Sequence, residues 1–198
     1  MELGTFPFGA SLRILGIDPG LQLTGYGVID YAPMRPKLVD AGVIRLNTKT
    51  DIPARLVELE RELQEIILEH KPEMCAIEQL YSHYGHPRTA ILMGHARGVI
   101  LLVAQRNHLK VQEFAANRIK QSLTGFGHAG KGQMQRAIQH QWNLAEPPEP
   151  PDVADALAVA LCCGRMMHES GHFPEKMPKR TRRHFPNNSL QSLLAKKG

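Results

Sequence analysis

Four acidic residues stand where a carboxylate could do chemistry. Asp18 closes a short apolar run and is followed at once by Pro-Gly, and Glu78 closes a second short apolar run. Asp152 and Asp155 lie three residues apart, directly after a group of prolines. A carboxylate at the end of a buried run must be paired or bound to a cation, because its desolvation otherwise costs kilocalories. These acids are therefore candidate metal ligands.

Each acid also has a simpler structural interpretation. Asp-Pro-Gly is a strong turn signature, in which the Asp18 side chain would bond its own backbone. Glu78 could end a strand that merely reaches the surface. Asp152 could cap the helix that follows it, with Asp155 favourable to the helix dipole. For each acid taken alone, both interpretations stay open.

The elements that must position these acids can be predicted from hydrophobic periodicity. Alternating or continuous apolar runs bounded by turn residues predict five strands, at 14–18, 24–31, 38–46, 74–80 and 110–115. Helical periodicity predicts helices between Pro53 and Pro72, at 88–106, from 117 onward with a glycine loop at 125–132, and at 152–168. The short links between the first three strands predict an antiparallel meander. The whole order predicts a single α/β domain, a mixed five-stranded sheet flanked by helices.

This arrangement favours the chemical interpretation of the acids. If the first and fourth strands are parallel neighbours, about 4.8 Å apart, Asp18 and Glu78 emerge side by side at one sheet edge. Residues three apart share a helix face, so Asp152 and Asp155 can point at the same spot. Four such carboxylates need cations, and their oxygens suit Mg²⁺ or Mn²⁺. Two such ions about 3.5–4 Å apart form an arrangement that cuts phosphodiesters, which predicts a nucleic-acid substrate.

Composition sets broader bounds. The formal net charge of +5 is compatible with a polyanionic partner. The longest apolar run, 99–104, is far shorter than the roughly 20 residues that cross a bilayer, and no export signal precedes the domain, so we expect a cytoplasmic protein without a membrane partner. The cysteines show no CxxC spacing and are expected in the core of a protein from a reducing compartment. We predict an extension at 1–11, a domain at 12–168 and a basic tail at 169–198.

Five segments together resemble one known family. They are ILGIDPG and TGYGVI within 14–29, AIEQ at 76–79, GHARGV at 94–99, KQSLTGFGHAGKGQMQ at 120–135 and PDVADALAVA at 151–160. In this order they resemble the RuvC-type Holliday-junction resolvases, nucleases of the ribonuclease H-like fold. The resemblance implies a structure-selective endonuclease that cuts two opposing strands of a four-way DNA junction symmetrically during recombination and repair.

The resemblance also implies residue roles and partners. Asp18, Glu78, Asp152 and Asp155 match the metal-binding catalytic acids, with Mg²⁺ as the expected cofactor, Mn²⁺ as a substitute and two ions per site. A homodimer is implied, which suits a near-symmetric junction, and a branch-migration motor complex is a further expected partner.

Three more residues receive roles from the same resemblance. Lys120 and Lys131 match positions that contact DNA phosphate near the acids, where cations offset the repulsion between carboxylates and backbone. Tyr81 stands where the family usually has phenylalanine, on a loop that inserts an aromatic ring among the bases at the junction centre. Base stacking, worth about 1–3 kcal/mol, tolerates this exchange.

Two other motifs are present but lack their required context. The segment 125–131 matches GxGxxG and most of GxxxxGK, yet Gly132 replaces the Ser or Thr that would hold Mg²⁺, and a predicted helix precedes it where a strand is required. The segment 168–172 satisfies the HExxH pattern of zinc proteases, but position 178 supplies no third ligand and Pro174 ends the helix. We interpret the first as a connector between helices and keep the second as a minor alternative.

Two rivals share the expected fold. GIDPG and TGYG also resemble the first phosphate loop of actin-like ATPases and sugar kinases, but those chains need a duplicated second domain that is absent here. A junction-binding protein that does not cut is the stronger rival. It would be expected to lose one of the acids, whereas this chain has all four.

Overall fold

The computed structural model describes residues 11–80 and 87–171, and these contain a five-stranded mixed sheet in the order β3-β2-β1-β4-β5. Strands β1, β2 and β3 are antiparallel, whereas β4 runs parallel to both β1 and β5. The strands are β1 (Leu12–Asp18), β2 (Leu23–Tyr31), β3 (Lys37–Arg45), β4 (Met74–Glu78) and β5 (Lys110–Phe114). The predicted meander and parallel pair are confirmed.

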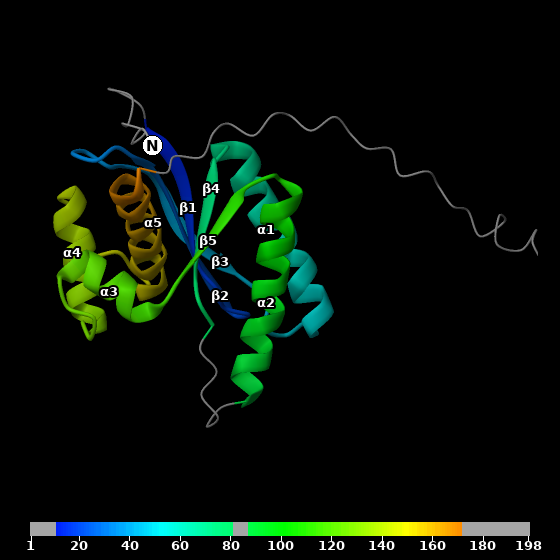
Figure 1. Ribbon diagram of the computed structural model, residues 1–198. Coiled ribbons are helices and arrows are strands. Elements are labelled where there is room, and N and C mark those ends of the chain that lie inside the picture. The colour runs from blue at the N-terminus through cyan, green and yellow to red at the C-terminus, as the bar shows by residue number, and fades with distance from the viewer. Residues whose placement is uncertain (1–10, 81–86, 172–198) are drawn as a thin grey trace, which may run out of the picture.

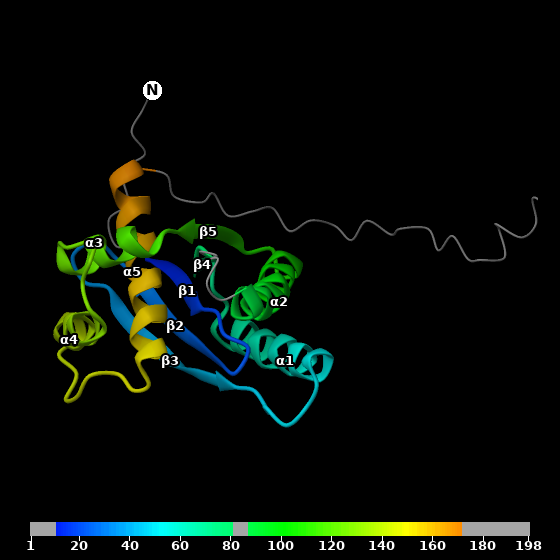
Figure 2. The ribbon, with the colours of Figure 1, turned by 90° about the horizontal axis from the view of Figure 1, so that it is seen from below.

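Helices cover both faces of this sheet (Figures 1 and 2). Helices α1 (Ile52–His70) and α2 (Pro87–Arg106) lie on one face. Helices α3 (Ala116–Thr124), α4 (Lys131–Trp142) and α5 (Pro151–Ser170) lie on the other. The predicted α/β class, a mixed sheet flanked by helices, is therefore confirmed.

Two apolar clusters, one on each face, hold the layers together. Period-two alternation sends Ile14 of β1 into the cluster beneath α5, and Leu15 into the cluster beneath α1 and α2. Cys75, Cys162 and Cys163 are all buried in these clusters, as predicted. Among the described residues, no helix combines the length and hydropathy needed to span a bilayer.

Several predicted boundaries shift by a few residues. Strand β4 ends at Glu78 rather than at position 80, and α4 begins at Lys131, which shortens the glycine loop to 125–130. Helix α5 runs to Ser170, past the predicted domain end at 168. Nearly all of the predicted extension and tail lie outside the described residues, so those boundaries stay predictions.

An ion pair between Arg13 and Asp30 ties β1 to β2 and provides a stability test. The Arg13 Nε lies 2.7 Å from an Asp30 carboxylate oxygen, and hydrogen bonds from Arg13, helped by its charge, lower the pKa of Asp30. Because the folded pKa is depressed, this stabilisation is present above the ordinary pKa of 3.8 and is lost as pH falls through the lowered value. Asp30→Asn is expected to reduce the free energy of unfolding by about 1 kcal/mol at pH 7.

Urea denaturation at pH 7 and at about pH 3 checks this expectation, because the difference from wild type should shrink at the lower pH. The control is Glu62→Gln, which removes an exposed pair with Arg61 and should leave the unfolding midpoint unchanged. An equal loss at both pH values would assign the effect to packing instead of charge.

Candidate active site

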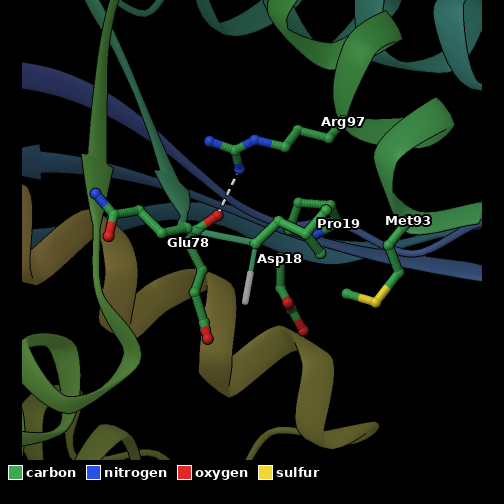
Figure 3. A pocket seen from close by; sticks show the side chains of 7 residues that line it. Asp18, Pro19, Glu78, Met93 and Arg97 are labelled. Atoms are coloured by element: carbon green, nitrogen blue, oxygen red, sulfur yellow. Dashed lines mark hydrogen bonds between the residues drawn. The ribbon is translucent and has the colours of Figure 1, made fainter. Parts of the chain in front are cut away.

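Asp18 and Glu78 lie at the ends of two adjacent parallel strands. The last paired residues of β1 and β4 are Ile17 and Ile77, and each acid is the next residue along its strand. By period-two alternation, Asp18 shares a face with Ile14, and this face carries α5. Figure 3 shows both carboxyl side chains pointing to the same side, toward the ribbon of α5. The sheet therefore places the two acids side by side, as expected.

Helix α5 packs directly against the strands that carry these acids. A Cβ on Gly25 of β2 would lie 2.1 Å from the backbone oxygen of Asp152, and a Cβ on Gly16 of β1 would lie 2.2 Å from that of Ala156. Only hydrogen at both positions allows this approach. Glycines thus bring the first turns of α5, which carry Asp152 and Asp155, onto the edge where Asp18 lies.

The simpler interpretation of Asp152 as a helix cap is wrong. Helix α5 begins at Pro151, its N-cap is Pro150, and no side chain caps it. Asp152 stands inside the first turn, where it interacts favourably with the helix dipole.

The turn after Asp18 is held by a different side chain. The Thr24 hydroxyl donates to the Gly20 carbonyl at 2.6 Å and accepts from the Gly20 N–H at 3.2 Å. Within the described segments, the Asp18 carboxylate itself takes part in no hydrogen bond. The turn therefore fixes where the strand stops and leaves this carboxylate available for another partner.

The acids are electrostatically coupled. Burial and, to a smaller extent, the negative charges of Asp155, Glu78 and Asp152 together raise the pKa of Asp18 to about 8, while the positive charge of Lys131 opposes this rise. Burial also raises the pKa of Glu78, to which the negative charge of Asp155 adds a smaller contribution. Burial likewise raises the pKa of Asp155. A group of buried oxygen donors with too little positive charge around it fits a hard divalent cation.

The four carboxylates do not form a preassembled metal-binding site. Among residues 11–80 and 87–171, no three His, Cys, Asp or Glu side chains lie close enough together to hold a metal ion. The backbone brings the acids to one edge, where the described residues form no preassembled group of three ligands.

Both predicted lysines adjoin this edge. A pocket of about 190 Å³ is lined by Glu78, Asp155, Lys120 from α3 and Lys131 from α4, among others. A second pocket, of about 160 Å³, is lined by Asp18 and Glu78, among others. Five of the seven predicted site residues thus line these two pockets, and Asp152 adjoins them, since its charge acts on Asp18. Tyr81 lies outside the described residues.

The two unrelated motifs gain no support from their surroundings. The glycine loop at 125–130 connects α3 to α4, so a helix precedes it and a phosphate-binding strand–loop–helix is excluded. His168 of the HExxH segment lies in the last turn of α5, and His172 is outside the described residues.

The sequence alone does not indicate a role for Arg97, although this residue lies in the GHARGV segment. Its guanidinium donates to the Glu78 carbonyl at 2.5 Å and lies 2.8 Å from a Glu113 carboxylate oxygen. Gly16 and Gly25 likewise stand out in the sequence only as parts of the ILGIDPG and TGYGVI motifs. Neither spacing nor periodicity reveals such contacts.

The family model of crossover junction endodeoxyribonuclease RuvC matches residues 14–163. This chain belongs to the RuvC family. The family member from Rhodopirellula baltica is 49% identical over 154 residues, covering 78% of this chain and 86% of that protein. The member from Alkaliphilus oremlandii is 44% identical over 149 residues, covering 75% and 90%.

Solved structures agree with this assignment. Thermus thermophilus RuvC in complex with Holliday junction substrate has a TM-score of 0.75 at 26% identity, over 81% of this chain and 97% of that one. The yeast mitochondrial Holliday junction resolvase Ydc2, with a TM-score of 0.62 at 16% identity, shares the fold. As a RuvC-family member, this chain is a metal-dependent nuclease with a ribonuclease H-like fold.

Proposed function

We propose that this chain resolves four-way DNA junctions by metal-dependent hydrolysis of two opposing strands during recombination and repair. The observation that carries the proposal is the convergence of acids from β1, β4 and α5 on one sheet edge, beside Lys120 and Lys131. The relatives named crossover junction endodeoxyribonuclease, and the related structure bound to a Holliday junction, support the choice of substrate.

In this proposal Asp18, Glu78, Asp152 and Asp155 bind two Mg²⁺ ions, for which Mn²⁺ can substitute. Divalent ions held there supply Lewis-acid activation of water and of the scissile phosphate. The chain contributes four oxygen-donating side chains, and the partial burial of Asp18 limits the water that competes for them. The raised pKa values support the assignment, because a bound cation would stabilise the ionised carboxylates.

In this proposal the two lysines bind DNA phosphate. Burial raises the pKa of Glu78 and of Asp18, and this rise is opposed by the charge of Lys120 at Glu78 and of Lys131 at Asp18, so both cations act on the acidic edge. A phosphate entering this edge meets attraction from the lysines that offsets carboxylate repulsion. Stacking of Tyr81 at the junction centre stays a prediction.

The proposed assembly is a homodimer, because two identical sites related by a twofold axis can cut opposing strands symmetrically. A branch-migration motor complex is a further proposed partner. The rival protein that binds junctions without cutting them would show the same binding, so cleavage itself has to be measured.

The deciding experiment incubates the protein with a synthetic four-way junction and with matched linear duplex, in Mg²⁺ and in EDTA. Paired nicks in opposing strands of the junction, only with Mg²⁺, are expected. Equal cutting of both substrates would refute junction selectivity. Tight junction binding without cutting in Mg²⁺ or Mn²⁺ would favour the rival.

Lys120→Ala is expected to weaken junction binding about 3- to 10-fold and to reduce the slope of log affinity against log salt by about 1, because one phosphate contact is lost. Titrations at several salt concentrations in EDTA measure both quantities. The control is Lys110→Ala, at the start of β5 and so at the opposite end of the sheet from Glu78. An unchanged salt slope for Lys120→Ala would remove this lysine from the DNA-binding surface.

A further inference from the structure

Arg97 connects three elements at the end of β4. It extends from α2 and its side chain is only 12% exposed. One terminal nitrogen donates to the Glu78 carbonyl at 2.5 Å (Figure 3). The other lies 2.8 Å from the carboxylate of Glu113 on β5. A largely buried guanidinium that bridges a strand end and a carboxylate is held far more firmly than an exposed one.

The contact is made at the backbone of Glu78 and not at its side chain. In Figure 3 the guanidinium of Arg97 approaches from the α2 side, while the Glu78 carboxyl group points away from it, toward α5. The next residue, Gln79, is fixed as well, since its N–H donates to the Phe114 carbonyl at 2.8 Å. The last peptide of β4 is thus anchored to α2 through Arg97 and to β5 through Phe114.

Anchoring this peptide matters because the carboxylate of Glu78 moves with it. The direction of a side chain is set by its backbone, and a displacement of about 1 Å at a reacting group can cost on the order of 100-fold in rate. Because β4 stops at Glu78, its last peptide is held by these two contacts at the end of the strand.

We infer that Arg97 is a positioning residue that holds Glu78 for metal-dependent cleavage, with Glu113 holding Arg97. This inference rests on the proposed role of Glu78 as a metal ligand. Arg97 acts through the backbone, and its two contacts and low exposure leave it poorly placed to bind DNA phosphate.

The test compares Arg97→Gln, Glu113→Gln and the double variant in single-turnover junction cleavage across a Mg²⁺ titration. Arg97→Gln is expected to slow cleavage about 10- to 100-fold and to raise the half-saturating Mg²⁺ several-fold, with junction affinity in EDTA unchanged within about twofold. Glu113→Gln should produce a smaller change in the same direction. The double variant should be no worse than Arg97→Gln, because both residues act through one contact. Arg97→Lys, which keeps one donor group, should recover part of the rate.

A second readout needs no cleavage. Mg²⁺ is expected to raise the unfolding temperature of the wild type, and Arg97→Gln should need several-fold more Mg²⁺ for the same rise. The matched control is Arg106→Gln on the same helix α2, which breaks an exposed pair with Glu60 of α1 and should match wild type in every measurement. Cleavage and junction binding are measured below the unfolding temperature of every variant, so that a folding defect is not scored as a positioning defect.

The outcomes separate this inference from the proposal on which it rests. Arg97→Gln with wild-type rate and Mg²⁺ dependence would overturn the inference, and so would an equal loss of rate and junction affinity, which would indicate a DNA contact. A parallel Glu78→Gln variant that cuts like wild type would instead overturn the proposed site.

Discussion

Asp18→Asn is expected to reduce junction cleavage by at least about 1,000-fold while leaving junction affinity within about twofold. The substitution preserves the shape of the side chain and removes its charge, and Asp18 is the most strongly perturbed acid of the site. Binding rests on basic groups and DNA shape, so the loss of a metal ligand should leave it intact. Cleavage in Mg²⁺ and binding in EDTA, measured on the same junction, check the two halves of the expectation.

The same variant should be more stable than wild type without metal. Because burial and three acidic neighbours raise the pKa of Asp18 from 3.8 to about 8, its ionised form costs folding energy. For an acid with a raised folded pKa, this cost is absent below the ordinary value and grows as pH rises toward the folded value. Removing the charge should raise the unfolding temperature in EDTA by about 3–6 °C at pH 8, and by less at pH 5.

Magnesium supplies the complementary measurement. It should stabilise the wild type and have a much smaller effect on Asp18→Asn, because the variant has lost a ligand. Glu65→Gln, an exposed change on α1, is the control and should alter neither cleavage nor the response to Mg²⁺. If Asp18→Asn still cut at the wild-type rate, Asp18 would not be a catalytic ligand; a joint loss of cutting and folding would make it a structural residue.

The sequence was sufficient to predict the adjacency of Asp18 and Glu78, because that adjacency follows from topology. Parallel strands joined by a crossover end at the same sheet edge, and both strands were recognisable as apolar runs that close on an acid. Pro151 at the first position of α5 could also have been predicted, since proline favours that position. It would have excluded Asp152 as the cap.

Contacts between distant segments could not be predicted in this way. The hydrogen bond from Arg97 to the Glu78 carbonyl joins a side chain to a backbone atom, so no residue pattern at Glu78 predicts it. The approach of α5 to the strands depends equally on packing, because a glycine in a strand predicts a close neighbour without saying which one. These contacts adjust how the acids converge, and the structure was needed to find them.

The glycine contact leads to the second large expected effect. Gly25→Ala should slow cleavage about 100-fold or more, because the new methyl group would meet the Asp152 backbone oxygen at 2.1 Å and push the start of α5 off the sheet. Backbone meets backbone here, so no flexible side chain can yield, and the overpacking should also cost about 1–3 kcal/mol of stability. Single-turnover cleavage and urea denaturation measure the two effects.

The matched control is Gly98→Ala on α2, where an added Cβ meets nothing within 4 Å. In a helix interior this change should stabilise the protein by about 0.5–1 kcal/mol and leave the cleavage rate unchanged. Junction affinity of Gly25→Ala should fall far less than its rate, since Lys120 and Lys131 lie on α3 and α4 rather than on the displaced helix. A Gly25→Ala variant that cuts normally would show that α5 can shift without moving Asp152 and Asp155 out of reach of Asp18. The distance between α5 and the sheet would then not control the site.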